Sequence, residues 1–416
     1  MPMNFHTPSR RELLLASGVL FAWANLPKAA MAQGRDPRLL VIVLRGALDG
    51  LAAVPPVGDP DWAGLRGDKA MLLDGKTPAL PLDSLFALNP AMPTLHRLYK
   101  NGQAAIVHAV ATPYRERSHF DGQDVLESGL TKPGAADSGW LNRALGTLES
   151  AGRANPKGGN AFAVGPVTPL VARGKAPVLS WTPPRLPPPS DDTMMRLLDL
   201  YNHTDPALAR VLEERLGLST IARAGGIDER PQKGKAKTAG AAQQLRAYFA
   251  DSAGAAAKFL ARPDGPRIGA LAFDGWDTHA AEGEVEGRLA NLLGALDGAI
   301  AAIETGMGPA WRETAVAVVT EFGRTARVNG TDGTDHGTAT VAFLAGGAIK
   351  GGRVLTDWPG LKERNLYEGR DLKPTTDLRA VLKGLLQHHV GVTDKALASA
   401  VFPGSENVKP AEGLVA

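Results

Sequence analysis

Short apolar runs separated by polar turns define the predicted fold of this chain. Residues 39–44 form an unbroken run of leucine and β-branched side chains, bounded by Pro37 before it and by Arg45 and Gly46 after it. Such a run is typical of a strand that is buried on both faces of a parallel sheet. Further strand-like runs cover residues 104–110, 268–273, 315–320 and 339–344, and helices are predicted at residues 92–99, 194–218, 241–261 and 378–386. The alternation predicts an α/β fold, a three-layer α/β/α sandwich around a mostly parallel sheet.

One long segment departs from this regular pattern. Residues 183–189 contain five prolines in seven positions, and residues 224–244 are rich in glycine, alanine and lysine. Both compositions are typical of irregular structure. We therefore expect residues 33–416 to form one domain, with a less regular insert at about residues 150–262.

Composition limits the possible functions only in part. The 416 residues are 44% hydrophobic, which is enough to bury a large core, and the formal charge of +3 is too small to indicate a nucleic-acid partner. The chain contains no cysteine. Disulfides, thiolate metal sites and a cysteine nucleophile are therefore excluded.

The first 32 residues look like a twin-arginine signal peptide. Arg10 and Arg11 precede an apolar stretch at residues 13–26, and Ala30-Met31-Ala32 has the form of a signal-peptidase site. The apolar stretch is short for a membrane span, so a cleaved signal is favoured over a retained anchor. We expect a periplasmic or secreted protein that meets the twin-arginine translocase during export and has no stable membrane span.

Acidic and imidazole side chains gather at the ends of the predicted strands. The densest groups are residues 273–279 and 333–337, and Asp49 follows the first strand. These groups should meet at one edge of the sheet, where α/β proteins place their sites. Carboxylates and imidazoles are ligands for hard and borderline cations. We therefore favour metal ligation over structural pairing for Asp49, Asp277, His279 and His336.

Seven separated motifs carry a resemblance to a known family. In chain order they are Leu44-Arg45-Gly46, Asp49-Gly50, Arg117-Ser118-His119-Phe120-Asp121, Ser138-Gly139-Trp140-Leu141-Asn142-Arg143, Trp276-Asp277-Thr278-His279, Glu321-Phe322-Gly323-Arg324 and Thr334-Asp335-His336-Gly337. Their order resembles the alkaline-phosphatase superfamily and, more narrowly, its secreted domain-of-unknown-function 1501 family. The resemblance spans residues 39–402 and implies an alkaline-phosphatase-like, sulfatase-like fold.

The resemblance implies a site for one or two divalent ions, of Zn, Mg, Ca or Mn, and a hydroxyl nucleophile. Asp49 stands in the place of the first-strand carboxylate. Asp277 and His279 stand in the place of the middle ligand pair, with Asp274 a rival for the acidic member. His336 is similar to the late histidine ligand.

A second acidic ligand has two readings under this resemblance. Glu321 stands in the place of the acidic member of an aspartate–histidine pair, but Phe322 follows it where the imidazole would be. Alternatively, Asp335 and His336 form the pair, and His119 replaces the late histidine.

The nucleophile implied by the resemblance falls near Ser118 and His119, about ten residues before Ser128-Gly129. Ser118 at a helix start would gain from the unpaired N–H groups there. Ser118 is equally suited to be only a helix N-cap. The segment Ala111-Thr112-Pro113-Tyr114-Arg115 has alanine where sulfatases carry the residue that they oxidise, which disfavours a formylglycine.

Several arginines lie beside these groups. Arg45, Arg117 and Arg324 could bind substrate phosphate or sulfate oxygens in two-point contacts, or could pair with carboxylates of the site. The leading hypothesis is a metal-dependent hydrolase of small-molecule or polymer-borne phosphate or sulfate esters. One alternative is a secreted binding or assembly protein that retains the fold. Another is a metal-dependent enzyme for a different polar substrate, with His119 as acid or base.

Overall fold

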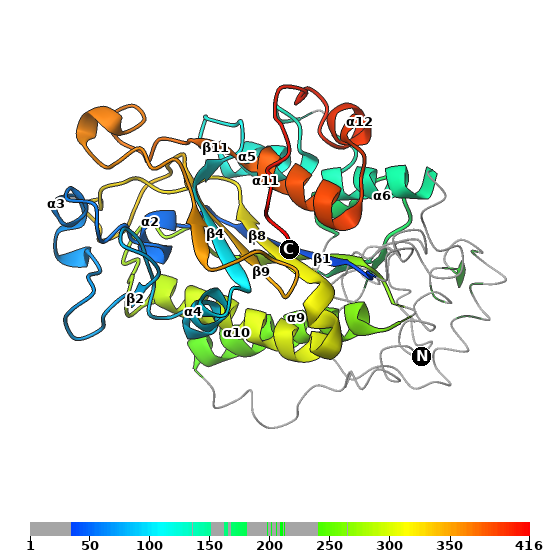
Figure 1. The fold of residues 1–416 in the computed structure, drawn as a ribbon, viewed down its shortest axis with the longest axis horizontal. Helices are drawn as coiled ribbons and strands as arrows, with labels where there is room; N and C mark the ends of the chain where they lie inside the picture. The colour runs from blue at the N-terminus through cyan, green and yellow to red at the C-terminus, as the bar shows by residue number, and fades with distance from the viewer. Residues whose placement is uncertain are drawn as a thin grey trace, which may run out of the picture.

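The computed structural model describes residues 35–134, 136–150, 162–164, 168–180, 240–263 and 265–416, with a few single positions between 198 and 212 (Figure 1). The expected signal peptide and most of the expected insert, including its proline-rich stretch and the helix expected at residues 194–218, lie outside the described residues.

A mostly parallel sheet forms the centre of the described structure. Its strand order is β10-β4-β9-β8-β1-β7-β5-β6, and β11 also pairs with β4. Only β9 runs against its neighbours β4 and β8. The strands are β1 (Arg38–Arg45), β4 (Ala104–Ala111), β5 (Phe162–Val164), β6 (Leu179–Ser180), β7 (Ile268–Asp274), β8 (Thr314–Thr320), β9 (Thr340–Ala345), β10 (Arg353–Leu355) and β11 (Thr376–Asp377); β2 (Leu80–Pro81) and β3 (Ala87–Leu88) form a separate hairpin.

The first strand shows why the apolar runs are continuous. β1 lies between β7 and β8, in parallel with both. Because successive side chains point to opposite faces, Leu40, Ile42 and Leu44 enter one apolar cluster while Leu39, Val41 and Val43 enter another. Both faces of the sheet are therefore buried.

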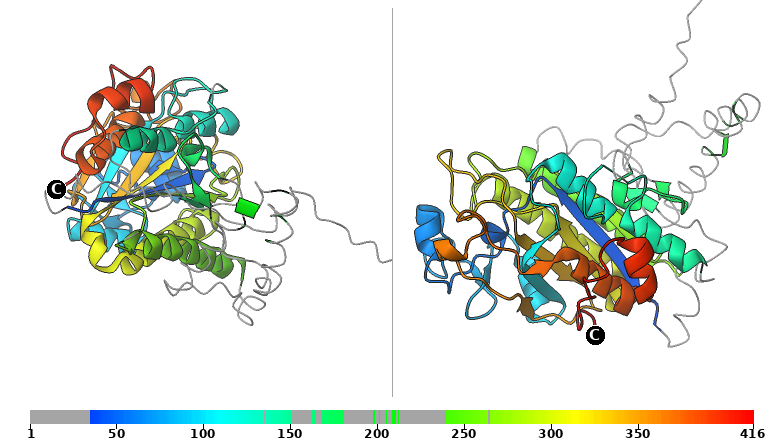
Figure 2. Two further views of the ribbon diagram at one scale, coloured as in Figure 1. Left: turned by 90° about the vertical axis from the view of Figure 1, so that its right-hand side faces the viewer. Right: turned by 90° about the horizontal axis from the view of Figure 1, so that it is seen from above.

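Helices cover both faces of this sheet (Figures 1 and 2). The long pair α9 and α10 packs with α4 against one face, and α5, α6 and α11 contribute to the cluster on the other. None of the helices in the described part of the chain has the length and hydropathy needed to cross a membrane. The helices are α2 (Gly50–Ala53), α3 (Trp62–Arg66), α4 (Pro93–Lys100), α5 (His119–Ser128), α6 (Trp140–Ser150), α9 (Ala241–Ala261), α10 (Arg288–Met307), α11 (Leu378–Leu385) and α12 (Asp394–Ala396), with shorter helical turns at Gly67–Lys69, Leu170–Ala172, Gly308–Glu313, Glu363–Asn365, Leu386–Val390 and Leu397–Val401.

These elements confirm the prediction of a mixed α/β fold around a mostly parallel sheet. The parallel strands β1, β4, β7 and β8 end at one edge of the sheet. Because β9 is antiparallel, it begins at this same edge, so the loop before it joins the loops that follow the other strands. All of the predicted polar groups beside strands are thereby brought to one side of the molecule.

Candidate metal centre

His119 is the first residue of α5, and its ring is held by a buried carboxylate. Its Nδ1 lies 2.9 Å from Oε1 of Glu321, the residue that follows β8. When such a ring is neutral, as a metal ligand must be, the Nδ1–H that it donates to the carboxylate leaves the lone pair on Nε2. This Nε2 is buried and has no hydrogen-bond partner. The hydrogen bond to Glu321 raises the pKa of His119 although burial opposes it.

Glu321 is positioned by several donors besides His119. Its Oε1 accepts the Gly46 N–H at 2.8 Å and the Gln123 amide at 3.2 Å, and its Oε2 accepts the Thr320 hydroxyl at 2.8 Å. Burial alone would raise the pKa of Glu321, but the bond to His119 and the other donors lower it below its ordinary value. The carboxylate is therefore charged and points its oxygens at protein donors.

His336 lies on the loop before β9 and has the same arrangement. Its Nδ1 lies 2.8 Å from the carbonyl oxygen of Arg117, which accepts the Nδ1 proton. The lone pair of the neutral ring is therefore on Nε2. Burial, and then the nearby charge of His119, lower the pKa of His336, which favours this neutral form. A neutral imidazole is the form that ligates metals.

Asp277, on the loop after β7, faces these two rings. Its Oδ1 lies 3.5 Å from Nε2 of His119 and 3.4 Å from Nε2 of His336. One atom from each of the three residues lies within 4.8 Å of the other two, so they form a group able to hold a metal ion. His279 adjoins the group, since its Nε2 lies 3.1 Å from Asp277 Oδ1 and 2.8 Å from His336 Nε2.

The spacing of these atoms suits a small tetrahedral ion. With bonds of 2.0–2.1 Å, the ligand atoms of a tetrahedral zinc site stand about 3.3 Å apart. The three separations from Asp277 Oδ1 to Nε2 atoms are 3.5, 3.4 and 3.1 Å. The contact between His279 and His336 is shorter at 2.8 Å, so these two rings would move apart by about half an ångström on ligation.

Gly46 allows the Asp277 loop to reach this position. It has a φ of +120°, and a Cβ on it would lie 2.5 Å from the backbone nitrogen of Asp277. Any side chain would therefore collide with this loop, and the backbone conformation favours glycine. The same residue donates its N–H to Glu321, so one glycine positions both sides of the group.

Two of the expected ligands, Glu321 and Asp335, contact the Nδ1 atoms of His119 and His279 instead of facing the common point of the group. Glu321 holds His119 from the Nδ1 side, as described. Oδ1 of Asp335 lies 3.4 Å from Nδ1 of His279, and its side chain is 53% exposed. Both are placed to orient imidazoles, a common arrangement in metal sites.

Asp49 and Asp274 do not join the group, contrary to our expectation for Asp49. Asp49 is buried, accepts the Leu51 and Ala52 N–H groups at the start of α2, and pairs with the buried Arg66 through a 2.6 Å contact. Its oxygens are thus committed to protein donors. Asp274 ends β7 with a side chain that is 71% exposed and lies 3.9 Å from Arg45. Of the two rivals after β7, Asp277 is therefore the one in the group.

The three arginines expected to bind substrate all pair with carboxylates. Arg45 contacts Glu127 at 2.6 Å, and Arg324 contacts Asp277 at 2.7 Å. Arg117 contacts Glu368 and Asp371 at 2.5 and 2.9 Å. Only Arg324 thus pairs with a carboxylate of the site, whereas Arg45 and Arg117 pair with carboxylates outside the group.

Ser118 precedes α5 as its N-cap residue, but its side chain makes no capping hydrogen bond. Its backbone N–H donates to the Tyr114 hydroxyl at 3.2 Å. The placement at a helix start is as expected, whereas the capping role is not seen.

Sequence reasoning missed the aromatic and amide neighbours of His119. Phe322 stacks on the His119 ring with centroids 5.0 Å apart, and Gln123 adds a donor to Glu321. In the sequence, Phe322 drew attention only because it stands where the resemblance would place a histidine. The position of Gln123, four residues after His119 on the same helix face, was a signal that could have been used.

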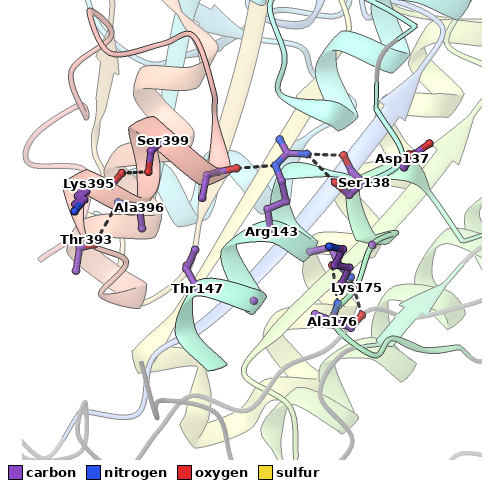
Figure 3. Close-up of a pocket in the computed structure, with 14 residues that line it drawn as sticks. Asp137, Ser138, Arg143, Thr147, Lys175, Ala176, Thr393, Lys395, Ala396 and Ser399 are labelled. Carbon is purple, nitrogen blue, oxygen red and sulfur yellow. Dashed lines mark hydrogen bonds between the residues drawn. The ribbon is translucent and has the colours of Figure 1, made fainter. Parts of the chain in front are cut away.

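A separate pocket of about 990 Å³ lies between α6 and the α12 region (Figure 3). Its lining includes Arg143, Lys175 and Lys395. Arg143 is already bound to carbonyl oxygens of Ser138 and Ala400. None of the residues of the metal group lines this pocket, which supplies no comparable chemistry.

Comparison with known proteins gives one result. Neither the curated proteins nor the solved structures gave a match to this chain. A family model described as "Protein of unknown function (DUF1501)" matches residues 36–401. The match covers most of the chain, and the protein therefore belongs to this family.

Proposed function

We propose that the protein is an exported, metal-dependent hydrolase of phosphate or sulfate esters. The observation that carries the proposal is the convergence of His119, Asp277 and His336, in which Nε2 of each imidazole lies 3.5 or 3.4 Å from the same carboxylate oxygen. Four such groups, with His279 as the fourth, gathered from three loops at one edge of the sheet are costly to assemble without a ligand.

The chemistry of the donors favours one borderline cation. Up to three imidazoles and one carboxylate suit Zn²⁺ better than Mg²⁺, Ca²⁺ or Mn²⁺, which prefer oxygen ligands. A bound ion of this kind would polarise an ester oxygen and activate a hydroxyl or water. We propose one ion rather than two, because protein donors hold both oxygens of Asp49 and of Glu321, two of the ligands expected for a pair of ions. In Asp277, by contrast, Arg324 binds Oδ1 alone.

The chain's own residues would have distinct roles around that ion. Glu321 fixes the His119 tautomer, and the Arg117 carbonyl fixes that of His336. Arg324 holds Asp277 in place and keeps it ionised, since the pKa of Asp277 is lowered below its ordinary value against the effect of burial. Ser118, directly before His119, is the proposed nucleophile.

The wider assignments belong to the same proposal. The helices on both faces of the sheet are consistent with an alkaline-phosphatase-like three-layer sandwich and with membership of the sulfatase-like superfamily. Arg10, Arg11 and the apolar stretch after them support export by the twin-arginine translocase to the periplasm or beyond.

One observation favours the alternative of a secreted binding or assembly protein. Arg45, Arg117 and Arg324 each pair with a carboxylate, so none of them offers an uncommitted charge to an anionic ester. A protein that binds metal but turns over no ester would fit this arrangement.

Elemental analysis and ester hydrolysis together test the proposal. The purified protein should contain about one Zn per chain and hydrolyse aryl phosphates or aryl sulfates. Asp277→Asn and His336→Gln should lose the ion and the activity. Asp274→Asn and His388→Gln are the matched controls, because these exposed residues lie outside the group, and they should lose neither.

The results separate the two functions. Metal-loaded protein that cleaves neither ester class from about pH 5 to pH 10 would support the binding protein over the hydrolase. Protein that contains no ion after loading with Zn²⁺ and Mn²⁺ would refute the metal centre itself.

A further inference from the structure

A buried layer of polar side chains lies directly beneath the ligand residues. It consists of Thr278, Glu282, Arg324 and Thr334, all of which are almost completely inaccessible to solvent. From the sequence, only Arg324 was expected to pair with a carboxylate of the site, and Glu282 was not singled out. Polar groups are kept in such a position only when their hydrogen bonds are satisfied.

Glu282 is the centre of this layer. The Thr278 hydroxyl donates to its Oε1 at 2.8 Å, and the Thr334 hydroxyl donates to its Oε2 at 2.9 Å. Thr278 stands between Asp277 and His279, whereas Thr334 lies on the loop that carries His336. One carboxyl group therefore connects the two loops that supply the ligands.

Arg324 completes a closed circuit in which every link is a hydrogen bond except the peptide bond between Asp277 and Thr278. Its Nε and Nη2 donate to the hydroxyl and the carbonyl oxygen of Thr334, at 3.2 and 2.6 Å. Its Nη1 donates to Asp277 at 2.7 Å. The path thus runs from Asp277 through Thr278, Glu282, Thr334 and Arg324 back to Asp277.

We propose that Glu282 is a positioning residue for the metal centre, which holds the Asp277–His279 loop and the His336 loop at ligation distance before any ion binds. The inference rests on the proposed function, because it assumes that these residues bind a metal. Burial, and then the charge of Asp49, raise the pKa of Glu282 to about 8. In its neutral form the carboxyl would donate its own O–H to one of the two threonine hydroxyls, which would then accept. Glutamine, with one donor and one acceptor, is a close substitute for a neutral carboxyl.

Metal titration of two Glu282 variants tests this role. Glu282→Met fills the space without a strong hydrogen-bond acceptor, and we expect Zn²⁺ affinity to fall about 10–100-fold, the usual effect of losing a group that orients ligands. Glu282→Gln should restore affinity to within about threefold of wild type. Affinity is measured by competition with a chromophoric chelator, and bound Co²⁺ should show a weakened visible spectrum in the methionine variant only.

Asp297→Leu is the matched control. Asp297 is another buried carboxyl, but it accepts the Thr94 and Leu95 N–H groups of α4 and is not part of the circuit. Its loss should reduce stability while leaving Zn²⁺ affinity unchanged. A similar loss of Zn²⁺ affinity in Glu282→Met and Asp297→Leu would overturn the positioning role. It would mean that removing any buried carboxyl group weakens Zn²⁺ binding.

The remaining outcomes are also decisive. Wild-type affinity in Glu282→Met would overturn the inference while leaving the metal centre intact. Wild-type protein that binds neither Zn²⁺ nor Co²⁺ would refute the proposed function, and the inference with it. If Glu282→Met does not fold, Thr278→Val and Thr334→Val carry the test, because each removes one hydroxyl donor and should weaken Zn²⁺ binding several-fold.

Discussion

Asp49 provides a sharp test of the difference between a metal ligand and a structural carboxylate. In the structure, both of its oxygens contact the guanidinium of Arg66, at 2.6 and 3.1 Å, and both side chains are buried. Asp49→Asn replaces one of these oxygens with an amide nitrogen. That nitrogen would face an Arg66 N–H donor, and the arginine charge would lose its partner.

The expected cost follows from this geometry. Removing one partner of a buried ion pair typically costs 3–5 kcal/mol. The N–H groups of Leu51 and Ala52 donate to Oδ1, an atom that asparagine retains. These capping hydrogen bonds should therefore persist and add little to the loss of stability. We therefore expect the free energy of unfolding to fall by about 4 kcal/mol, with Zn²⁺ affinity of the folded protein unchanged.

Urea unfolding followed by circular dichroism measures the change in the free energy of unfolding, as the shift in midpoint multiplied by the wild-type m value. Arg66→Met in the Asp49→Asn background should recover part of the loss, because it removes the unpaired charge. Asp274→Asn is the surface control and should change stability by less than about 0.5 kcal/mol. A folded Asp49→Asn protein of normal stability that has lost its ion would refute this reasoning and make Asp49 a ligand.

Three further predictions follow from other residues. Burial lowers the pKa of His108 from 6.5 to about 4, so the native state takes up fewer protons than the unfolded chain between these pH values. The free energy of unfolding of the wild type relative to His108→Gln should therefore fall by roughly 3 kcal/mol as the pH falls from 6.5 to 4. A difference in urea midpoints that does not change with pH would contradict this. Ser118→Ala should abolish aryl ester hydrolysis with metal content retained and, because the hydroxyl caps nothing, cost under about 0.5 kcal/mol; retained activity would exclude it as the nucleophile. Replacing Arg10 and Arg11 together with lysine should leave precursor in the cytoplasm on immunoblots of cell fractions, whereas a mature form in the periplasm would exclude twin-arginine dependence.

The elements of the fold could be predicted because their sequence patterns are local. The run at residues 39–44 is apolar at every position, which only a strand buried on both faces requires, and it became β1. The helix expected at residues 241–261 is α9 with the same bounds. His108, inside the apolar run predicted at residues 104–110, is fully buried with bonds to Val54 and Ala109.

The roles within the site were harder to predict because they depend on partners far away in the chain. Nothing near Asp49 indicates that a buried arginine, Arg66, will approach it, and nothing near Glu321 indicates that His119 will lie in front of it. The motifs show which residue types gather at the sheet edge. Only the three-dimensional arrangement shows which oxygen atoms remain available after the protein's own donors are satisfied.

The position of β1 in the sheet has a consequence for how the chain is made. This strand leaves the ribosome early, yet its two neighbours, β7 and β8, come from the second half of the sequence. At 5–20 residues per second, synthesis reaches β7 roughly 10–50 s after β1. Throughout that interval β1, with its unbroken apolar run at residues 39–44, lacks both of its sheet neighbours, the condition under which strands pair with the wrong partner. Yield of native protein should therefore depend on conditions that protect nascent strands, such as slow expression at low temperature or an excess of chaperone.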